Sequence, residues 1–151
     1  MEISCSEEIN APAEEVWSIM TNLEGFPDAI GAIESVERLD AGTGFDVGTT
    51  WRETRIMFGR TATEDMWVTE VDPGHSYVVE ANSHGAEYRT TQSVQPDGDG
   101  GSVLSMSFSA NPTGTMAKVM SATVGRFFVN ATRKAFEQDL ADIATAAESS
   151  P

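Results

Sequence analysis

Short alternating segments joined by tight turns, followed by one long amphipathic segment, most constrain how this chain folds. Between residues 32 and 110, apolar and polar residues alternate along six segments, with turns such as Gly59-Arg60 and Ser83-His84-Gly85 between them. Strands joined by such short turns pair antiparallel, and an antiparallel sheet buries at least one face. After Asn111-Pro112, apolar residues recur at steps of three and four, which predicts a long helix with one apolar face. The pattern predicts an α+β grip, in which a curved sheet wraps around the C-terminal helix.

The segment before residue 32 completes the expected order of elements. Ile3, Cys5 and Ile9 alternate and predict a first strand over residues 2–9. Asn10-Ala11-Pro12 then starts a helix that ends at Gly25, and residues 26–30 predict a second short helix. The six later strands are predicted at residues 32–39, 48–58, 61–71, 77–82, 86–94 and 103–110. A chain of 151 residues is short for two cores, so we expect a single domain over residues 1–151.

Composition and charge narrow the classes of partner. Nine Lys and Arg against 24 Asp and Glu leave an acidic protein with a formal net charge of −15, which disfavours nucleic acid and anionic membrane surfaces. No stretch approaches the ~20 apolar residues of a membrane span, and the start has no signal-peptide pattern, so a cytoplasmic location is expected. With one cysteine and two separated histidines there is no metal-ligand spacing, and no phosphate-binding glycine loop appears. We therefore expect neither a metal nor a cofactor.

The register of the first hairpin predicts which side chains face the interior. A turn centred on Gly59-Arg60 would pair Arg55 with Glu64 and Glu53 with Met66, which places them on one face. This face holds most of the apolar residues of the hairpin and is expected inside. The same reasoning extends the inward face to the second hairpin and the last strand, through Tyr77, Val79, Ala81, Ala86, Tyr88, Thr90, Gln92, Val94, Leu104, Met106, Phe108 and Ala110.

The inward face contains more polar groups than a dry core tolerates. One explanation is an ion pair between Arg55 and Glu64 that also holds Glu53 and has no other role. The other is a solvent-containing cavity between the sheet and the long helix, since a few polar groups in an apolar hollow are typical of a ligand site. The methionines expected inside suit either plain packing or an adaptable binding surface; they are Met57, Met66, Met106, Met116 and Met120.

Three stretches of this sequence resemble the START/Bet v 1-like (SRPBCC) superfamily. They are Ile9-Asn10-Ala11-Pro12-Ala13-Glu14-Glu15-Val16-Trp17, Val47-Gly48-Thr49-Thr50-Trp51-Arg52-Glu53 and Val68-Thr69-Glu70-Val71-Asp72-Pro73, together with the long closing helix. Within it the chain most resembles the bacterial polyketide cyclase/dehydrase and lipid-transport-like group. The resemblance implies a helix-grip fold: seven antiparallel strands curved around the C-terminal helix, two short helices between the first and second strands, and a deep cavity.

The resemblance leaves three functions open, because members bind lipids, sterols, polyketides or hormones, only some catalyse a reaction, and none shares a universal catalytic residue. The first is binding of a largely apolar small molecule. The second is a cyclase or dehydratase, with Glu53 or Glu64 as base, Tyr88 or Tyr77 as proton donor and Arg55 holding an oxyanion, although flanking carboxylates would neutralise that arginine. The expected ligand-binding residues are Trp51, Glu53, Arg55, Glu64, Met66, Tyr77, Tyr88, Gln92, Met106, Phe108, Met116, Met120 and Phe127.

The third function is a protein-interaction module. Ile56, Phe58 and Trp67 are expected on the outer face of the sheet, where they would form an apolar contact patch. Such a patch suits either a partner protein or a second copy of the chain, so both a monomer and a homodimer are compatible with the sequence.

Overall fold

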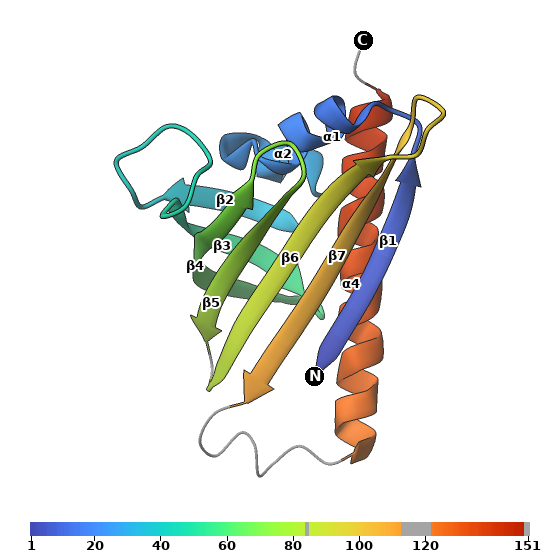
Figure 1. The fold of residues 1–151 in the computed structure, drawn as a ribbon. Helices are drawn as coiled ribbons and strands as arrows, with labels where there is room; N and C mark the ends of the chain where they lie inside the picture. Colours follow the sequence, from blue (N-terminus) through green and yellow to red (C-terminus); the bar gives the residue numbers. More distant parts are fainter. Residues whose placement is uncertain (84, 113–121, 150–151) are drawn as a thin grey trace.

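Seven strands form one antiparallel sheet that curves around a long C-terminal helix (Figure 1). The computed structural model describes residues 1–83, 85–112 and 122–149. The strands are β1 (Glu2–Ile9), β2 (Ile33–Arg38), β3 (Thr50–Met57), β4 (Arg60–Asp72), β5 (Ser76–Ser83), β6 (Ala86–Pro96) and β7 (Ser102–Pro112). Their order in the sheet is β1-β7-β6-β5-β4-β3-β2. All neighbours pair antiparallel, as the short turns predict.

The helices stand where the sequence predicts them. α1 (Ala13–Met20), the 3-10 helix η1 (Leu23–Gly25) and α2 (Phe26–Ala29) lie between β1 and β2, and α4 (Ala122–Glu148) follows β7. Figure 1 shows α4 running along the concave side of the sheet, with α1 and α2 near its C-terminal end. The predicted helix-grip architecture is therefore confirmed. Within the described residues, no helix has the length and apolarity needed to cross a membrane.

The first hairpin turns earlier than the sequence predicts. Met57 pairs with Arg60, so the turn consists of Phe58 and Gly59, both with positive φ (54° and 75°). Two positive φ values are the requirement of the type I′ turn, whose twist matches that of the strands. The predicted pairing of Arg55 with Glu64 is therefore wrong, because Arg55 opposes Ala62.

The corrected register changes partners without changing faces. Glu53 lies directly opposite Glu64, which is a shift of two residues from the predicted pairing. Because side chains alternate with a period of two, such a shift keeps every residue on its predicted face. In the second hairpin Tyr77 pairs with Gln92 and Ala81 with Tyr88, as the predicted face requires.

The buried face of α4 differs from the predicted one in the first half of the helix. The predicted row runs through Phe127, Ala131 and Ala135, but Phe127 is 76% exposed and the buried side chains are Thr132 and Phe136. From Leu140 onward the prediction holds, with Leu140, Ile143 and Ala147 buried. Two adjacent rows of side chains on this helix are apolar, so the sequence alone does not determine which row is buried. Burying the row with Phe136 removes more apolar surface from water than burying the row of alanines.

Candidate functional site

A cavity of about 280 Å³ lies between the concave face of the sheet and α4. Strands β2 to β7 form one wall, α4 forms the opposite wall, and α1 and α2 contribute side chains at one end. Most of the lining is apolar or aromatic. Beyond the predicted site residues it includes Met20, Phe26, Ile30, Ile33, Met57, Phe58, Ala62, Val79, Glu80, Ala81, Thr90, Phe128, Thr132, Phe136, Asp139 and Ile143.

The cavity brings together most of the residues that the sequence analysis selected. Those that line it are Trp51, Glu53, Arg55, Glu64, Met66, Tyr77, Tyr88, Gln92, Met106 and Phe108. Phe127 does not belong to this group, because it faces solvent and the neighbouring Phe128 lines the cavity instead. Met116 and Met120 lie outside the described residues. That the lining residues bind a ligand stays a prediction.

Arg55 forms a buried ion pair with a residue that the sequence analysis missed. Its Nη2 donates to both carboxylate oxygens of Asp139, at 2.9 and 2.7 Å. The pair joins the middle of β3 to α4 across the cavity wall, and both side chains are almost completely buried. Asp139 was detectable as a carboxylate three residues after Phe136 and four before Ile143, inside the apolar stripe of the helix. The side-chain partner of Arg55 is therefore on the helix, and not Glu64 across the hairpin.

Glu53 is a second buried carboxylate of the site, and its side chain is only 6% exposed. The indole Nε1 of Trp51 donates to its Oε1 at 3.3 Å. Burial raises the pKa of Glu53 above its ordinary value of 4.5, and the Arg55 guanidinium opposes this rise. Burial likewise raises the pKa of Asp139, again opposed by Arg55. Burial thus disfavours the charged form of both carboxyl groups, and the Arg55 guanidinium partly offsets this effect.

Removing the Glu53 carboxyl is expected to change how stability depends on pH. A folded-state pKa above the unfolded value means that the stability gained from the protonated form is lost as pH rises from about 4.5 through the folded pKa. The free energy of unfolding of Glu53→Gln, minus that of the natural protein, should therefore grow as pH rises from about 4.5 to the folded-state pKa, and stay constant above it. Urea denaturation of both proteins at a series of pH values measures this difference. Glu34→Gln, at an exposed carboxylate of β2, is the charge-matched control, and a constant difference for Glu53→Gln would contradict the prediction.

Aromatic rings close one end of the cavity. Phe45, in the loop between β2 and β3, packs its ring at 4.8 Å from the ring of Tyr77 and 6.0 Å from that of Trp51. Burial, and then the carboxyl of Glu53, raises the pKa of Tyr77. Phe26 approaches the other side of Trp51 edge-on, at 6.3 Å. This end of the cavity is therefore a rigid aromatic surface.

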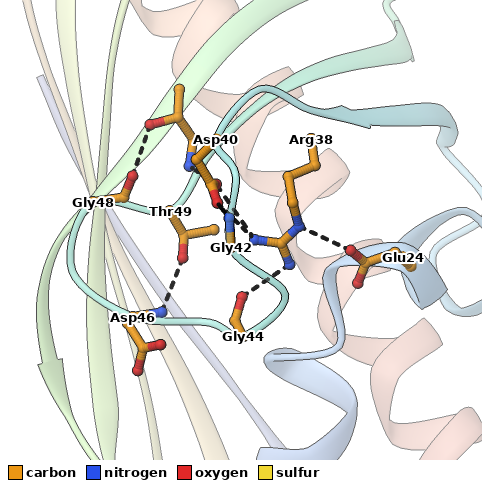
Figure 2. A network of polar contacts seen from close by, with 9 residues as sticks. Glu24, Arg38, Asp40, Gly42, Gly44, Asp46, Gly48 and Thr49 are labelled. Carbon is orange, nitrogen blue, oxygen red and sulfur yellow. Dashed lines mark hydrogen bonds and ion pairs between the residues drawn. The ribbon is translucent and has the colours of Figure 1, made fainter.

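A network of polar contacts holds the loop that carries Phe45 (Figure 2). Arg38 Nε donates to Glu24 at 3.0 Å, and its Nη2 donates to the carbonyl of Gly44 at 2.8 Å. Asp40 accepts from Arg38 Nη1 and from the backbone N–H groups of Gly42 and Thr50. Arg38 thus binds both Glu24 in η1 and Gly44 in the loop, and these contacts hold the loop next to the aromatic end of the cavity.

At the β3–β4 hairpin, Phe58 corrects a further expectation. The sequence analysis placed it on the outer face, but it lies in the turn, lines the cavity edge and packs its ring 5.7 Å from that of Phe128 on α4. A positive φ at a non-glycine residue such as Phe58 destabilises the folded chain by about 1–2 kcal/mol. Ile56 is exposed as expected, whereas Trp67 is half-buried, so the outer face offers less apolar surface than predicted.

Three buried polar atoms in the cavity wall have no hydrogen-bond partner among the described residues. They are Nε of Arg55, Oε1 of Gln92 and Oγ1 of Thr132. An unsatisfied buried polar group costs about 1–3 kcal/mol, so such groups concentrate where something else satisfies them. In the parts of the chain that the structure describes, no three His, Cys, Asp or Glu side chains gather in a way that could hold a metal ion. The unsatisfied atoms therefore give the cavity hydrogen-bonding capacity.

Solved structures confirm the fold. TTHA0849 from Thermus thermophilus superimposes with a TM-score of 0.80 at 18% identity, over 99% of this chain and 100% of that one. The Zhui aromatase/cyclase from Streptomyces sp. R1128 gives a TM-score of 0.77 at 17% identity, over 98% and 93% of the two chains. Ara h 8.0201 gives 0.68 at 15% identity, over 96% and 98%. At these identities the similarity establishes the shared Bet v 1-like architecture alone.

Sequence comparison extends this result to the family. No curated protein sequence matches the chain. The family model described as "Polyketide cyclase / dehydrase and lipid transport" matches residues 1–148, which is nearly the whole chain. The chain therefore belongs to the polyketide cyclase/dehydrase and lipid transport family.

Proposed function

We propose that this protein binds a largely apolar small molecule, such as a lipid or a polyketide, in the cavity between the sheet and α4. The observation that carries the proposal is the cavity itself, with a volume of about 280 Å³ and a lining that is mainly apolar with a few convergent polar groups. Small-molecule sites usually have this composition and volumes of roughly 300–1,000 Å³.

The apolar lining combines rigid and adaptable parts. Trp51 and Tyr77 form the rigid aromatic end, held from behind by Phe45. Met57, Met66 and Met106 line the walls, and methionine side chains adjust to irregular apolar shapes. This combination supports binding of an extended or ring-containing apolar molecule over binding of a small polar metabolite.

The chemistry of Arg55 favours binding over cyclisation or dehydration. An enzyme of that type needs a group to stabilise a developing oxyanion. Arg55 is the one positively charged side chain among the described residues that line the cavity. Its Nη2 is already engaged by both oxygens of Asp139, and Glu53 lies close enough to influence it electrostatically. An arginine whose charge is matched by carboxylates stabilises a further anion poorly, so the catalytic alternative is the weaker one.

Titration with Nile red, a neutral dye that fluoresces in apolar surroundings, tests the proposed function. The natural protein should bind the dye saturably. Thr90→Phe places a large side chain in the cavity from β6 and should weaken dye binding by at least about tenfold. Thr91→Phe makes the same substitution on the opposite face of that strand and should leave dye binding unchanged. Circular dichroism checks that both variants are folded.

Two results would contradict the proposal. One is the absence of saturable dye binding by the folded natural protein. The other is an equal loss of binding in Thr90→Phe and Thr91→Phe, which would place the dye outside the cavity.

A further inference from the structure

We infer that the cavity selects apolar molecules that carry a neutral hydroxyl group, an alcohol or a phenol, and rejects those that end in a carboxylate. The inference rests on the proposed function and defines the ligand class of the same site. It follows from two independent features of the cavity wall: the balance of charged side chains that face inward, and the kinds of hydrogen-bonding atom that are left unsatisfied.

The charged side chains of the cavity wall are mostly acidic. Glu53, Glu64 and Asp139 line it, and Arg55 is the single base among the lining residues that the structure describes. Arg55 pairs with Asp139 and also acts electrostatically on Glu53 and Glu64, so three carboxyl groups share one guanidinium. Glu80 also contributes to the lining, but it lies on the outer-facing row of β5 and its Oε2 is 3.6 Å from Nη1 of Arg89.

The remaining carboxyl groups lie together. Glu53 and Glu64 are directly opposite each other in the β3–β4 ladder, and like charges in that arrangement repel. Glu64 has no ion-pair partner among the residues described, and it also contributes to the raised pKa of Tyr88, after burial. A carboxylate or phosphate group on a ligand would place a further acidic group beside these two. Electrostatics therefore disfavour an anionic ligand group.

The unsatisfied atoms require both a donor and an acceptor. Nε of Arg55 can only donate, Oε1 of Gln92 can only accept, and the hydroxyl of Thr132 can do either. A carboxylate only accepts and would leave Gln92 unsatisfied, whereas an ammonium group only donates and would leave Arg55 unsatisfied. A hydroxyl group donates and accepts, and it carries no charge. It can therefore satisfy whichever of these atoms it reaches, which neither charged group can do.

The polar side chains that α4 contributes to the cavity wall lie next to apolar ones. Along α4 the lining residues are Phe128, Thr132, Phe136, Asp139 and Ile143, so polar and apolar side chains alternate by helical turns. A hydroxyl group at Thr132 would therefore place the apolar body of the same molecule against the neighbouring phenylalanines.

Displacement of Nile red by decanol, decanoate and decylammonium at neutral pH tests the inference, because these probes differ only in the terminal group. Decanol should displace the dye at a concentration at least about tenfold lower than either charged probe. Removal of one inward carboxylate in Glu64→Gln should improve displacement by decanoate about tenfold relative to displacement by decanol. Glu87→Gln, an exposed outward residue of β6, removes the same charge outside the cavity and should leave all three probes unchanged.

A second variant tests the hydrogen-bonding part. Thr132→Val removes the buried hydroxyl at nearly constant volume and should weaken decanol about two- to tenfold, the range that one hydrogen bond supplies. Thr132→Ser keeps the hydroxyl and should retain decanol binding. Nile red binding by both variants shows that the cavity is intact.

The outcomes separate the inference from the proposed function. If Nile red binds but decanoate or decylammonium displaces it as well as decanol does, the inference is wrong and the proposed function stands. The inference is also wrong if Glu64→Gln and Glu87→Gln have the same effect on decanoate. If neither the dye nor any probe binds the folded protein, the proposed function itself fails.

Discussion

Replacement of Asp139 by alanine should lower the free energy of unfolding by about 3–5 kcal/mol at neutral pH, the usual cost of removing one partner of a buried ion pair. The carboxylate holds Nη2 of Arg55 through two hydrogen bonds, and only 5% of Asp139 is exposed. Without Asp139, the guanidinium would remain in the cavity wall with its Nε and Nη2 both unsatisfied. Urea denaturation followed by circular dichroism measures the change.

A double variant separates the loss of the pair from the loss of packing. Arg55→Met combined with Asp139→Leu replaces both charges with apolar side chains of related size, and should recover most of the lost stability because no buried charge remains. Arg52→Met, which breaks an exposed ion pair with Asp65 on the outer face of β3, should cost no more than about 1 kcal/mol. An Asp139→Ala variant as stable as Arg52→Met would show that water solvates Arg55 in place of the carboxylate.

Substitutions on the buried face of α4 should lower the free energy of unfolding much more than substitutions on its exposed face. Leu140 is 0% exposed, and Leu140→Ala should cost about 2–5 kcal/mol through lost apolar contact and the hollow left behind. Phe127 is one of the exposed large apolar side chains, and Phe127→Ala should change stability by less than about 0.5 kcal/mol. Chemical denaturation of the two variants compares the faces directly. If Phe127→Ala lowered the free energy of unfolding more than Leu140→Ala, Phe127 would lie on the buried face of α4, as the sequence pattern predicts.

The candidate site shows how a fold shared by many proteins acquires its own chemistry. The sheet and α4 provide an apolar hollow, which the family relationship alone leads one to expect. Glu53, Arg55 and Asp139 add a mainly acidic polar region to it. Because the fold does not determine the activity, the proposed function depends on these side chains.

Sequence reasoning succeeded where the physical signal is local. Alternation with a period of two decided which side of β3, β5, β6 and β7 faces inward, and it placed Trp51, Tyr88 and Phe108 on the cavity wall. An error of two residues in the first hairpin did no harm, since residues two apart share a face. The order of elements was equally accessible, because short turns and the helical repeat are read from neighbouring residues.

Features that depend on distant parts of the chain were not accessible in this way. Arg55 and Asp139 are 84 residues apart, and nothing in either neighbourhood specifies the other. The rotation of α4, which buries Phe136 and exposes Phe127, depends on the shape of the sheet beneath it. Phe45 packs against Trp51 and Tyr77, and its loop is held by Arg38 and Asp40. Periodicity determined the faces of the strands, but packing between distant elements selected the ion-pair partner and the buried side of the helix, because those choices depend on which groups meet across the interior.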